Sequence, residues 1–451
     1  MAENILHICG FGPGPFNDVD DTAYHRQLLQ QLVGSLRGGN AYTNSTLIPQ
    51  DRFGGGTVPG VGRYGIRIFQ GGTYVGGPTA GSFIPASSSG VVCHGWYGQA
   101  VGASLDAVSF LDFTYKEGRD HTCWTFGAQD DGATSLVYIY KHNQAGATHT
   151  YTLKGTYEMP DRNAHRFQAV LDTTGGTPRC RLFVDGTVQI TATDAAVDTW
   201  ETQLTIFAQN QGKGSELEYH MSAYYVSELT GGSAARTAGW NIVGLAPNAD
   251  LDAASVDEWT SSTGGENKYR QVDDFNDNKG GGSDPTDNDP DTDYITSPTS
   301  GGKRQMFAFQ PITALVVPIY VTYWHAEQNF GGAAQCLVRL CDGTTVSETA
   351  ATVHADAFSC TRLPLNLAGA GWTEALINTM QGGPTTHVDN ISAVRVPVVC
   401  LEVMGTTSLA RPVANVESNN ADEVAHCAVS AAGIPNKQCL VNQAVNRSNT
   451  Y

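Results

Sequence analysis

The densest run of side chains that could bind a metal lies between residues 266 and 293, where carboxylates far outnumber cations. Within this run, acidic side chains recur at every second residue, at Asp287, Asp289, Asp291 and Asp293. In a loop, this spacing can direct several hard oxygen ligands at one Ca²⁺. The sharp-turn glycine and the closing glutamate of an EF-hand loop are missing. The interpretations are a structural calcium site, a solvated acidic loop, or a contact between subunits.

A second group of carboxylates lies near a predicted concave sheet in the first half of the chain, at Asp112, Glu117, Asp120, Asp130 and Asp131. A glycosidase needs two carboxylates about 5 to 10 Å apart across a cleft. The Glu-x-Asp-x-x-Glu strand of related sandwich hydrolases is absent from the sequence. We therefore predict that the protein is not an enzyme and keep glycan hydrolysis as an alternative.

Aromatic side chains near these acids could stack against a sugar. They are His94, Trp96, Tyr97, Trp124, Tyr138 and Tyr140. Aromatic faces on the loops and strands of a sandwich can bind pyranose rings, but the same residues on alternating strand positions can instead fill the core. The sequence leaves both interpretations open.

Other common catalytic and binding motifs are weak or missing. Gly60, Gly62 and Gly65 match the spacing of a dinucleotide-binding turn, but a strand follows them where that mechanism needs a helix. The ten cysteines include no Cys-x-x-Cys pair, which argues against a zinc ribbon or a thioredoxin-like site. We interpret them as buried thiols, while disulfides formed outside the cell stay open.

The composition favours strands and turns. The 451 residues are 41% hydrophobic and only 16% charged, and 51 of them are glycine. A net charge of −18 would repel polyphosphate and anionic lipid, so we expect no nucleic-acid partner. No apolar stretch approaches the roughly 20 residues of a membrane-spanning helix, and the amino terminus does not read as a secretory signal, so we expect no membrane insertion.

Period-two alternation dominates the chain from residue 60 onward and predicts many short strands, among them 148–153, 204–208 and 269–272. The clearest unit is a hairpin over 178–191 whose turn is Asp185-Gly186, because the favoured two-residue turn needs positive φ at both positions. Two helices are predicted, one inserted near residues 21–37 and a brief one over Thr373–Met380 with Thr373 as its cap.

These elements predict an all-β protein in two parts. A concanavalin-A-like β-sandwich, or jelly roll, occupies residues 1–229, with the inserted helix near 21–37. A glycine-rich linker at 230–239 leads to a second β-rich domain over 240–416. Residues 417–451 form a polar carboxyl-terminal arm, which either orders on a neighbouring subunit or is a loose tail.

Several sequence blocks resemble a known family. His165–Asp172 followed by Cys180–Gly186 resembles the laminin-G or concanavalin-A-like jelly roll, and Ile5–Phe11 and Gly62–Ile68 are similar to its opening strands in tailed bacteriophages. In the second half, blocks around Leu245, Glu258, Asp291–Ser297 and Gly371–Thr373 resemble a module that follows such a jelly roll in phage particles.

This resemblance implies a structural virion protein assembled in the host cytoplasm. We expect it in the tail, baseplate or fibre, as a homo-oligomer that contacts other virion proteins and host surface glycan. A capsid decoration protein is the alternative within the same class, and a carbohydrate-binding module or glycan hydrolase is the alternative of another class. No catalytic residue is carried over, because none of the matching blocks is a catalytic motif.

The calcium interpretation predicts a chelator effect on stability. Removing a structural cation leaves like charges unscreened, so EDTA should lower the melting temperature. In the variant Asp289→Ala with Asp291→Ala this sensitivity should vanish, as measured by differential scanning calorimetry with and without EDTA. A melting temperature that does not respond to the chelator would rule out the site.

Overall fold

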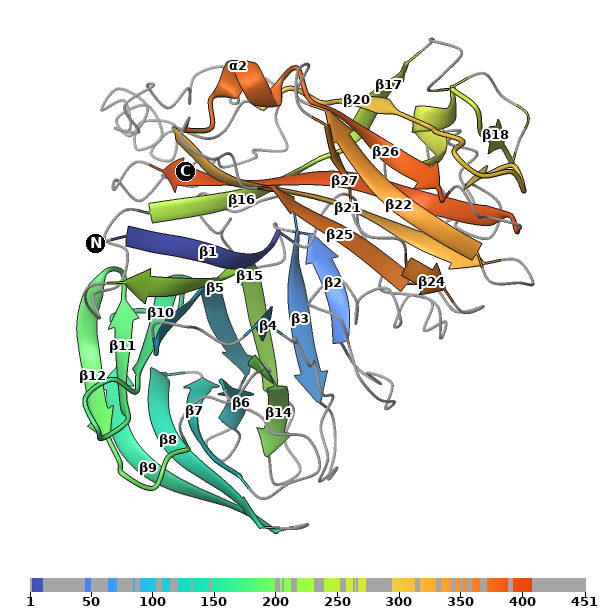
Figure 1. Ribbon diagram of the computed structural model, residues 1–451. Coiled ribbons are helices and arrows are strands. Elements are labelled where there is room, and N and C mark those ends of the chain that lie inside the picture. The colour runs from blue at the N-terminus through green and yellow to red at the C-terminus, as the bar shows by residue number, and fades with distance from the viewer. Residues whose placement is uncertain are drawn as a thin grey trace, which may run out of the picture.

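The computed structural model describes residues 2–10, 45–49, 64–70, 84–85, 90–102, 108–113, 121–130, 133–145, 148–198, 203–204, 207–211, 217–230, 239–251, 257–262, 264, 267–272, 294–312, 317–329, 334–341, 346–348, 352–354, 359–365, 371–387 and 392–407. Most of them lie in antiparallel strands, which confirms the predicted all-β sandwich class (Figure 1).

The first half of the chain forms a sandwich of two sheets. The larger sheet has the order β12-β11-β10-β5-β15-β3-β2, and β1 also pairs with β15. Its strands are β1 (Ala2–Cys9), β2 (Ser45–Pro49), β3 (Tyr64–Gln70), β5 (Val91–Gly102), β10 (His165–Asp172), β11 (Arg179–Val184), β12 (Thr187–Thr193) and β15 (Leu217–Thr230). The facing sheet, in the order β14-β6-β7-β8-β9, contains β6 (Val108–Asp112), β7 (His121–Asp130), β8 (Ser135–Ala145), β9 (Thr148–Glu158) and β14 (Phe207–Gln211). A short ribbon pairs β4 (Ile84–Pro85) with β13 (Gln203–Leu204).

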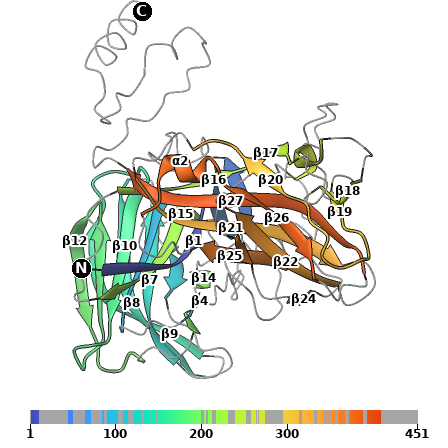
Figure 2. The same ribbon diagram turned by 45° about the horizontal axis from the view of Figure 1, so that its top comes forward.

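The second half forms another sandwich beside the first (Figures 1 and 2). One sheet has the order β18-β19-β27-β21-β25, with β16 also paired to β27, and the other has the order β17-β20-β26-β22-β23, with β24 paired to β22. The strands are β16 (Gly239–Leu245), β17 (Pro247–Asp250), β18 (Thr260–Ser261), β19 (Ile295–Thr296), β20 (Phe307–Phe309), β21 (Val317–Asn329), β22 (Ala334–Cys341), β23 (Val346–Glu348), β24 (Thr352–His354), β25 (Ser359–Leu365), β26 (Gln381–Thr386) and β27 (Val394–Thr407).

Local sequence signals account for several of these elements. Strands β11 and β12 form the predicted hairpin, and both turn residues have positive φ, 49° at Asp185 and 84° at Gly186. The short helix α2 (Glu374–Ile377) begins as predicted, because the Thr373 side chain accepts a hydrogen bond from the Leu376 amide at 3.2 Å.

Two local expectations were wrong. The alternation at 269–272 suggested a strand, but Lys268–Gln271 forms the 3₁₀ helix η2. The Asp250 carboxylate accepts the backbone N–H groups of Lys268 and Tyr269, which favours a helical turn over an extended segment. The single strand expected at 204–208 is divided between β13 and β14, which pair with different strands.

The core of the first sandwich lies between its two sheets. Alternate residues of β10 and β7 point into it, with Phe167, Ala169 and Leu171 meeting Phe126 and other apolar side chains. Rings pack closely there, and the Phe126 and Phe167 centroids are 5.3 Å apart. Burial of this apolar surface supplies the main driving force for closing the sheets.

A bulge in β15 changes which face its side chains occupy. Ser222 pairs with Tyr97 and Tyr225 with Gly95, so two residues of β15 lie opposite one residue of β5. Ala223 takes φ = 46° at this point. Tyr224 consequently faces the sandwich core and Tyr225 faces the second sandwich.

The two sandwiches share a buried seam centred on Trp240, the second residue of β16. The indole packs against Tyr225 at 4.9 Å and Tyr97 at 5.3 Å between centroids, and its Nε1 donates to the Ala223 carbonyl at 2.9 Å. Gly95 is required beside it, because a Cβ there would lie 2.1 Å from Tyr225 Cε1. The seam therefore joins the sandwiches through close packing of side chains.

Core residues of both halves are continuous across this region. Ile242 and Met404 pack with Ile8 and Tyr225, while Trp324 and Cys400 extend the core of the first sandwich. A buried polar contact adds to the seam, since the Gly10 amide donates to Glu402 Oε1 at 2.8 Å. The second sandwich also has its own core around Tyr323, Leu401 and their neighbours.

Some expectations fall outside the described residues. These are the helix near 21–37, the arm at 417–451 and most of the linker at 230–239, which separates the end of β15 from the start of β16. The domain boundaries stay predictions. Among the described residues, no helix has the length and apolarity needed to cross a bilayer.

The seam predicts a large effect of Trp240→Ala. Removing a buried indole leaves a cavity and should lower the free energy of unfolding by about 3–5 kcal/mol. Trp240→Phe keeps a ring against Tyr225 but loses the Nε1 donor, so its loss should be smaller. Urea denaturation followed by circular dichroism measures both, and equal stability of Trp240→Ala and the parent protein would contradict the seam.

Candidate functional site

The four aspartates of the calcium hypothesis, Asp287, Asp289, Asp291 and Asp293, lie outside the described residues. The segments on either side of their loop are described, and both contact β27. The Val399 amide donates to the Val272 carbonyl at 3.0 Å, and Ile295 and Thr296 pair with Val396 and Arg395. The loop is thus closed at its base, and the calcium site stays a prediction.

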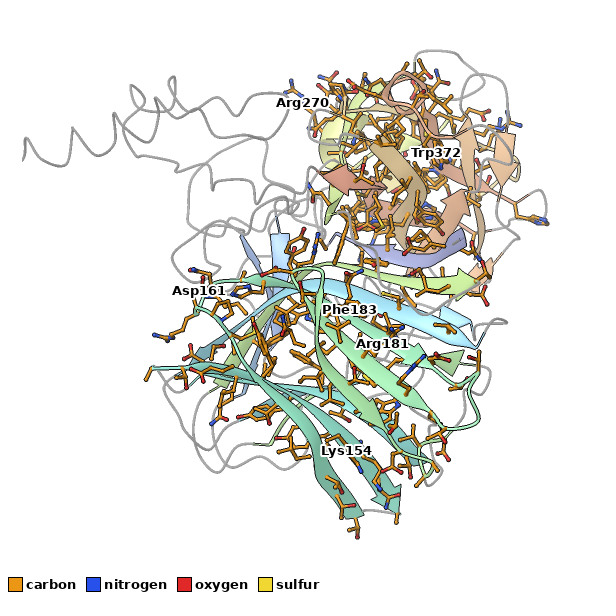
Figure 3. All side chains as sticks on the ribbon, turned by 90° about the vertical axis from the view of Figure 1, so that its left-hand side faces the viewer. Lys154, Asp161, Arg181, Phe183, Arg270 and Trp372 are labelled. Carbon is orange, nitrogen blue, oxygen red and sulfur yellow. The ribbon has the colours of Figure 1, made fainter. Side chains whose placement is uncertain are left out.

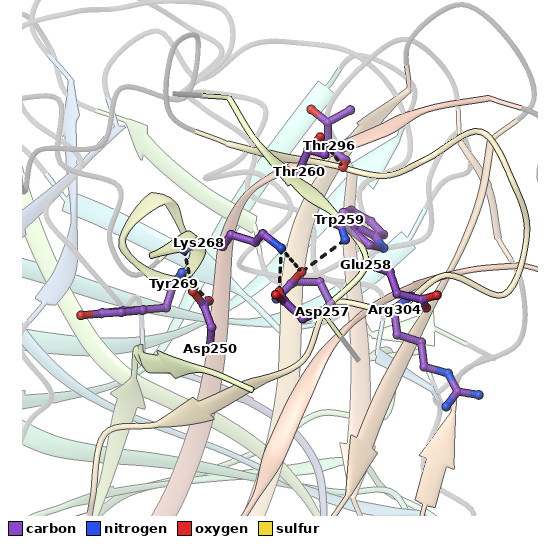
Figure 4. A network of polar contacts seen from close by, with 10 residues as sticks. Asp250, Asp257, Glu258, Trp259, Thr260, Lys268, Tyr269, Thr296 and Arg304 are labelled. Carbon is purple, nitrogen blue, oxygen red and sulfur yellow. Dashed lines mark hydrogen bonds and ion pairs between the residues drawn. The ribbon is translucent and has the colours of Figure 1, made fainter. Parts of the chain in front are cut away.

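Cations and a hydrogen-bonded network surround the start of this loop (Figure 4). Lys268 Nζ lies 2.6 Å from Asp257 Oδ1, and Gln305 Nε2 donates to the same oxygen at 2.8 Å. Burial raises the pKa of Asp250, whose carboxylate accepts the two amides at the start of η2. This network fixes the loop base, and within the described residues no group of three or more His, Cys, Asp or Glu side chains could hold a metal ion.

Four of the six predicted sugar-stacking residues are structural. Trp96 and Trp124 are buried in the first core, and Tyr97 is buried beneath Trp240. His94 is fully buried, and its Nδ1 lies 3.1 Å from Tyr224 Oη. Burial lowers the pKa of His94 to about 3, so its ring stays neutral at physiological pH.

The other two, Tyr138 and Tyr140, lie on the opposite side of the smaller sheet. Alternation along β8 directs Val137 and Ile139 into the core, and therefore directs Tyr138, Tyr140 and His142 away from it. The register pairs His142 with Tyr151 of β9. We call Tyr138, Tyr140, His142 and Tyr151 the tyrosine face.

The rings of the tyrosine face form a contacting row. Tyr138 and Tyr140 are 5.6 Å apart between centroids, Tyr140 and Tyr151 are 6.3 Å apart edge to face, and His142 stacks on Tyr151 at 4.4 Å. Tyr138 and His142 are buried, whereas Tyr140 and Tyr151 are half-buried, and Leu153 opposite Tyr140 is 52% exposed. The row therefore ends in apolar and aromatic surface that solvent reaches.

The phenols of this row are positioned as neutral donors. Tyr138 Oη donates to Gln129 Oε1 at 2.5 Å. Burial, with a smaller contribution from Tyr138, raises the pKa of Tyr140 to about 12. Such a surface can stack on an apolar ring face and donate hydrogen bonds at its edge.

An ion-pair clamp holds the two strands of the tyrosine face. Asp194, directly after β12, lies 3.0 Å from Lys141 Nζ on β8 and 2.7 Å from Lys154 Nζ on β9. Its pKa is held below the usual range, chiefly by the Lys154 hydrogen bond. The clamp links β9, an edge strand of the smaller sheet, to the end of β12, an edge strand of the larger sheet.

The predicted carboxylate pair is not brought together where the structure describes it. Asp130 is buried and bound by both Nε and Nη2 of Arg162, at 2.9 Å from Oδ1 and 2.7 Å from Oδ2. Asp112 pairs with Thr125, five residues along β7 from Asp130, or about 17 Å away at roughly 3.4 Å per residue. Glu117, Asp120 and Asp131 lie outside the described residues.

Sequence reasoning missed Tyr151, His142 and the Asp194 clamp. Tyr151 lies on the strand predicted over 148–153. The residue opposite it depends on the register of β8 with β9 and on the bulge after Ile139. That register is set by contacts distant in sequence. The Asp194 clamp likewise joins strands about 40–50 residues apart along the chain.

Comparisons with known proteins give fold-level likenesses. No family model and no curated protein sequence matches the chain. Among solved structures, the CBM2 module of the evolved Dit of Lactobacillus casei BL23 phage J-1 covers 50% of this chain and 95% of its own, with 12% identity and a TM-score of 0.27.

Carbohydrate-active proteins are also among the similar structures. An endo-1,3-β-glucanase from Streptomyces sioyaensis covers 50% of this chain and 96% of its own at 8% identity and a TM-score of 0.28. The module CBM66 from Bacillus subtilis covers 41% and 92% at 15% identity and a TM-score of 0.24. At these values, no residue role is transferred to this chain.

The clamp predicts an acid-sensitive contribution to stability. Because the pKa of Asp194 is lower in the folded state than its ordinary 3.8, the contribution is complete well above pH 3.8 and is lost as the pH falls below it. Asp194→Asn should lower the free energy of unfolding at pH 7 by about 1–3 kcal/mol and flatten its decline in acid.

The matched control is Asp198→Asn in the same turn, whose carboxylate accepts a hydrogen bond from the Thr122 amide at 2.8 Å. Urea denaturation from pH 7 to pH 2.5 measures all three proteins. An Asp194→Asn profile parallel to that of the parent protein would show that the clamp does not couple to pH.

Proposed function

We propose that the protein is a structural component of a bacteriophage particle, in the tail, baseplate or fibre, and that it contacts host surface glycan through the tyrosine face. The observation that carries the proposal is the row formed by Tyr138, Tyr140 and Tyr151 on a body whose two sandwiches share one buried seam. A rigid body that presents aromatic rings is suited to recognition at a particle surface.

The chemistry of the tyrosine face favours a sugar ligand. Pyranose rings have apolar faces that stack on aromatic rings, and their hydroxyls accept hydrogen bonds from phenols. The Tyr140 phenol, like that of an ordinary tyrosine, is protonated at physiological pH, and burial raises its pKa further, to about 12. Gln129 fixes the orientation of Tyr138, so that part of the surface is ordered before a ligand binds.

The seam supports a structural role. The larger sheet of the first sandwich packs against the smaller sheet on one face and against β16 and β27 on the other. Relative motion of the two halves would expose Trp240 and Tyr225 and separate Glu402 from the Gly10 amide. A body of this kind transmits load and position rather than opening and closing around a substrate.

Position in the particle is tested by labelling. Immunogold electron microscopy of intact virions with antibody against the protein should place gold at the tail or its tip. Uniform labelling of the head would instead support the capsid decoration alternative. Absence of the protein from purified particles, checked by mass spectrometry, would contradict the virion assignment as a whole.

Glycan contact is tested by removing single rings. Tyr140→Ala and Tyr151→Ala should each weaken binding to bacterial surface polysaccharides by about two- to tenfold, because each removes one stacking ring. Tyr294→Ala is the matched control, since that ring lies under Arg395 in the second sandwich. A glycan array followed by calorimetry measures the affinities.

Equal affinity in all four proteins would remove the tyrosine face from the proposal. No binding by the parent protein to any host polysaccharide would remove glycan contact and leave the structural role standing. Release of new reducing ends during the assay would favour the hydrolase alternative.

A further inference from the structure

Strand β12 forms an open edge of the larger sheet of the first sandwich. It pairs with β11 on one side, and no strand of the described chain pairs with its other side. Figure 1 places β12 at the outer margin of the molecule, and the view onto that margin shows Arg181 and Phe183 of the neighbouring β11 (Figure 3). Open edges present unpaired backbone groups to other chains.

The outward backbone groups can be identified. The Asp194 amide donates to the Pro178 carbonyl at 3.1 Å, so Asp194 and Pro178 form a hydrogen-bonded position of this ladder. Hydrogen-bonded and non-hydrogen-bonded positions alternate in an antiparallel pair. Ala192 therefore bonds toward β11, whereas the N–H and C=O groups of Thr191 and Thr193 point away from it.

Nothing in β12 protects this edge. Its sequence, Thr-Val-Gln-Ile-Thr-Ala-Thr, holds no charged residue and no proline, Thr191 and Thr193 are exposed, and Val188 is 41% exposed. The bulge between Leu182 and Phe183 lies at the turn end of the hairpin and leaves the last residues regular. Lysines, prolines and bulges are the usual protections of a natural edge strand.

The neighbouring edge strand β9 makes an informative contrast. It carries Lys154 and Glu158, and its ladder has a bulge opposite Ile139 and Tyr140. Each of these two edge strands has one bulge, but β9 carries charged side chains and β12 carries none. The difference points to β12 as the edge that is used for pairing.

We propose that β12 pairs antiparallel with β12 of a second copy of this chain and joins their larger sheets across a two-fold axis. One register places the outward backbone N–H and C=O groups of the two strands opposite each other. In it, Thr191 of each copy faces Thr193 of the other. Cross-strand threonine pairs are favourable, and self-pairing gives the same contacts to both subunits.

The low charge of this edge allows a second copy of the chain to approach it. The chain carries a net charge of −18, so two copies repel over most of their surfaces. Along β12 there is no carboxylate, and Asp194 at its end is neutralised by Lys141 and Lys154. Of the two arginines on β11, Arg179 is paired with Asp172, so Arg181 alone adds net positive charge beside this edge. Like-charge repulsion is therefore smallest where the two strands would meet.

The first test introduces like charges into the proposed β12–β12 interface of the full-length protein. Thr191→Lys with Thr193→Lys places lysines opposite lysines, which should weaken dimerisation by about tenfold or more. Thr152→Lys on β9 is the control for an added charge on an exposed edge strand. Analytical ultracentrifugation gives the dissociation constants, and circular dichroism checks that each variant is folded.

A second test reads the register directly. Facing hydrogen-bonded positions have Cα atoms about 5.5 Å apart, within the range of a disulfide. Thr191→Cys with Thr193→Cys should therefore give a covalent dimer on oxidation. The parent protein, oxidised alongside, is the control, and the five cysteines whose side chains are described are all buried thiols.

Three results would overturn the proposal. They are a parent protein that stays monomeric at every concentration, an oligomer whose dissociation constant is unchanged by the paired lysines, and cysteines that fail to cross-link a dimer of the folded variant. An edge that pairs only with a different virion protein would give the first of these results. The proposed β12–β12 interface does not involve the tyrosine face, so loss of dimers and loss of glycan binding are separate outcomes.

Discussion

The burial of Trp240 between two sheets is the interaction on which the rest of the structure depends. Its ring is enclosed by Tyr97 and Tyr225, its Nε1 reaches the Ala223 carbonyl, and the Arg166 guanidinium lies 5.5 Å from its centroid. A polar N–H buried in this way needs its partner, so the indole specifies both the distance and the orientation of the second sandwich. The seam acts as a single core shared by two folding units.

This arrangement decides which surfaces are left for recognition. The larger sheet of the first sandwich is packed on both faces, so its edges are what it can still offer to other chains, and β12 is one of them. The smaller sheet keeps its outer face, where Tyr140 and Tyr151 reach solvent. The edge of β12 and the outer face of β8 and β9 are separate surfaces, so contacts made at one leave the other accessible.

The sequence predicts what is local and misses what depends on register. The Asp185-Gly186 hairpin and the Thr373 cap follow from two or four residues, and both are confirmed. Period two shows that Tyr138 and Tyr140 share a face, but not which face is buried, so Trp96 and Trp124 were grouped with them. The fate of Asp130 was also hidden, because Arg162 lies beyond the next hairpin.

The bulge in β15 limits how this chain can change in length. Because Ala223 and Tyr224 together oppose one residue of β5, every side chain after them is shifted by one position relative to a regular strand. Deleting one of these two residues would restore regular pairing and leave Tyr225 opposite Gly95, on the face that it already occupies. A single-residue insertion or deletion after Tyr225 would instead exchange the faces of every later residue of the strand, so β15 tolerates a change of length at the bulge and not beyond it.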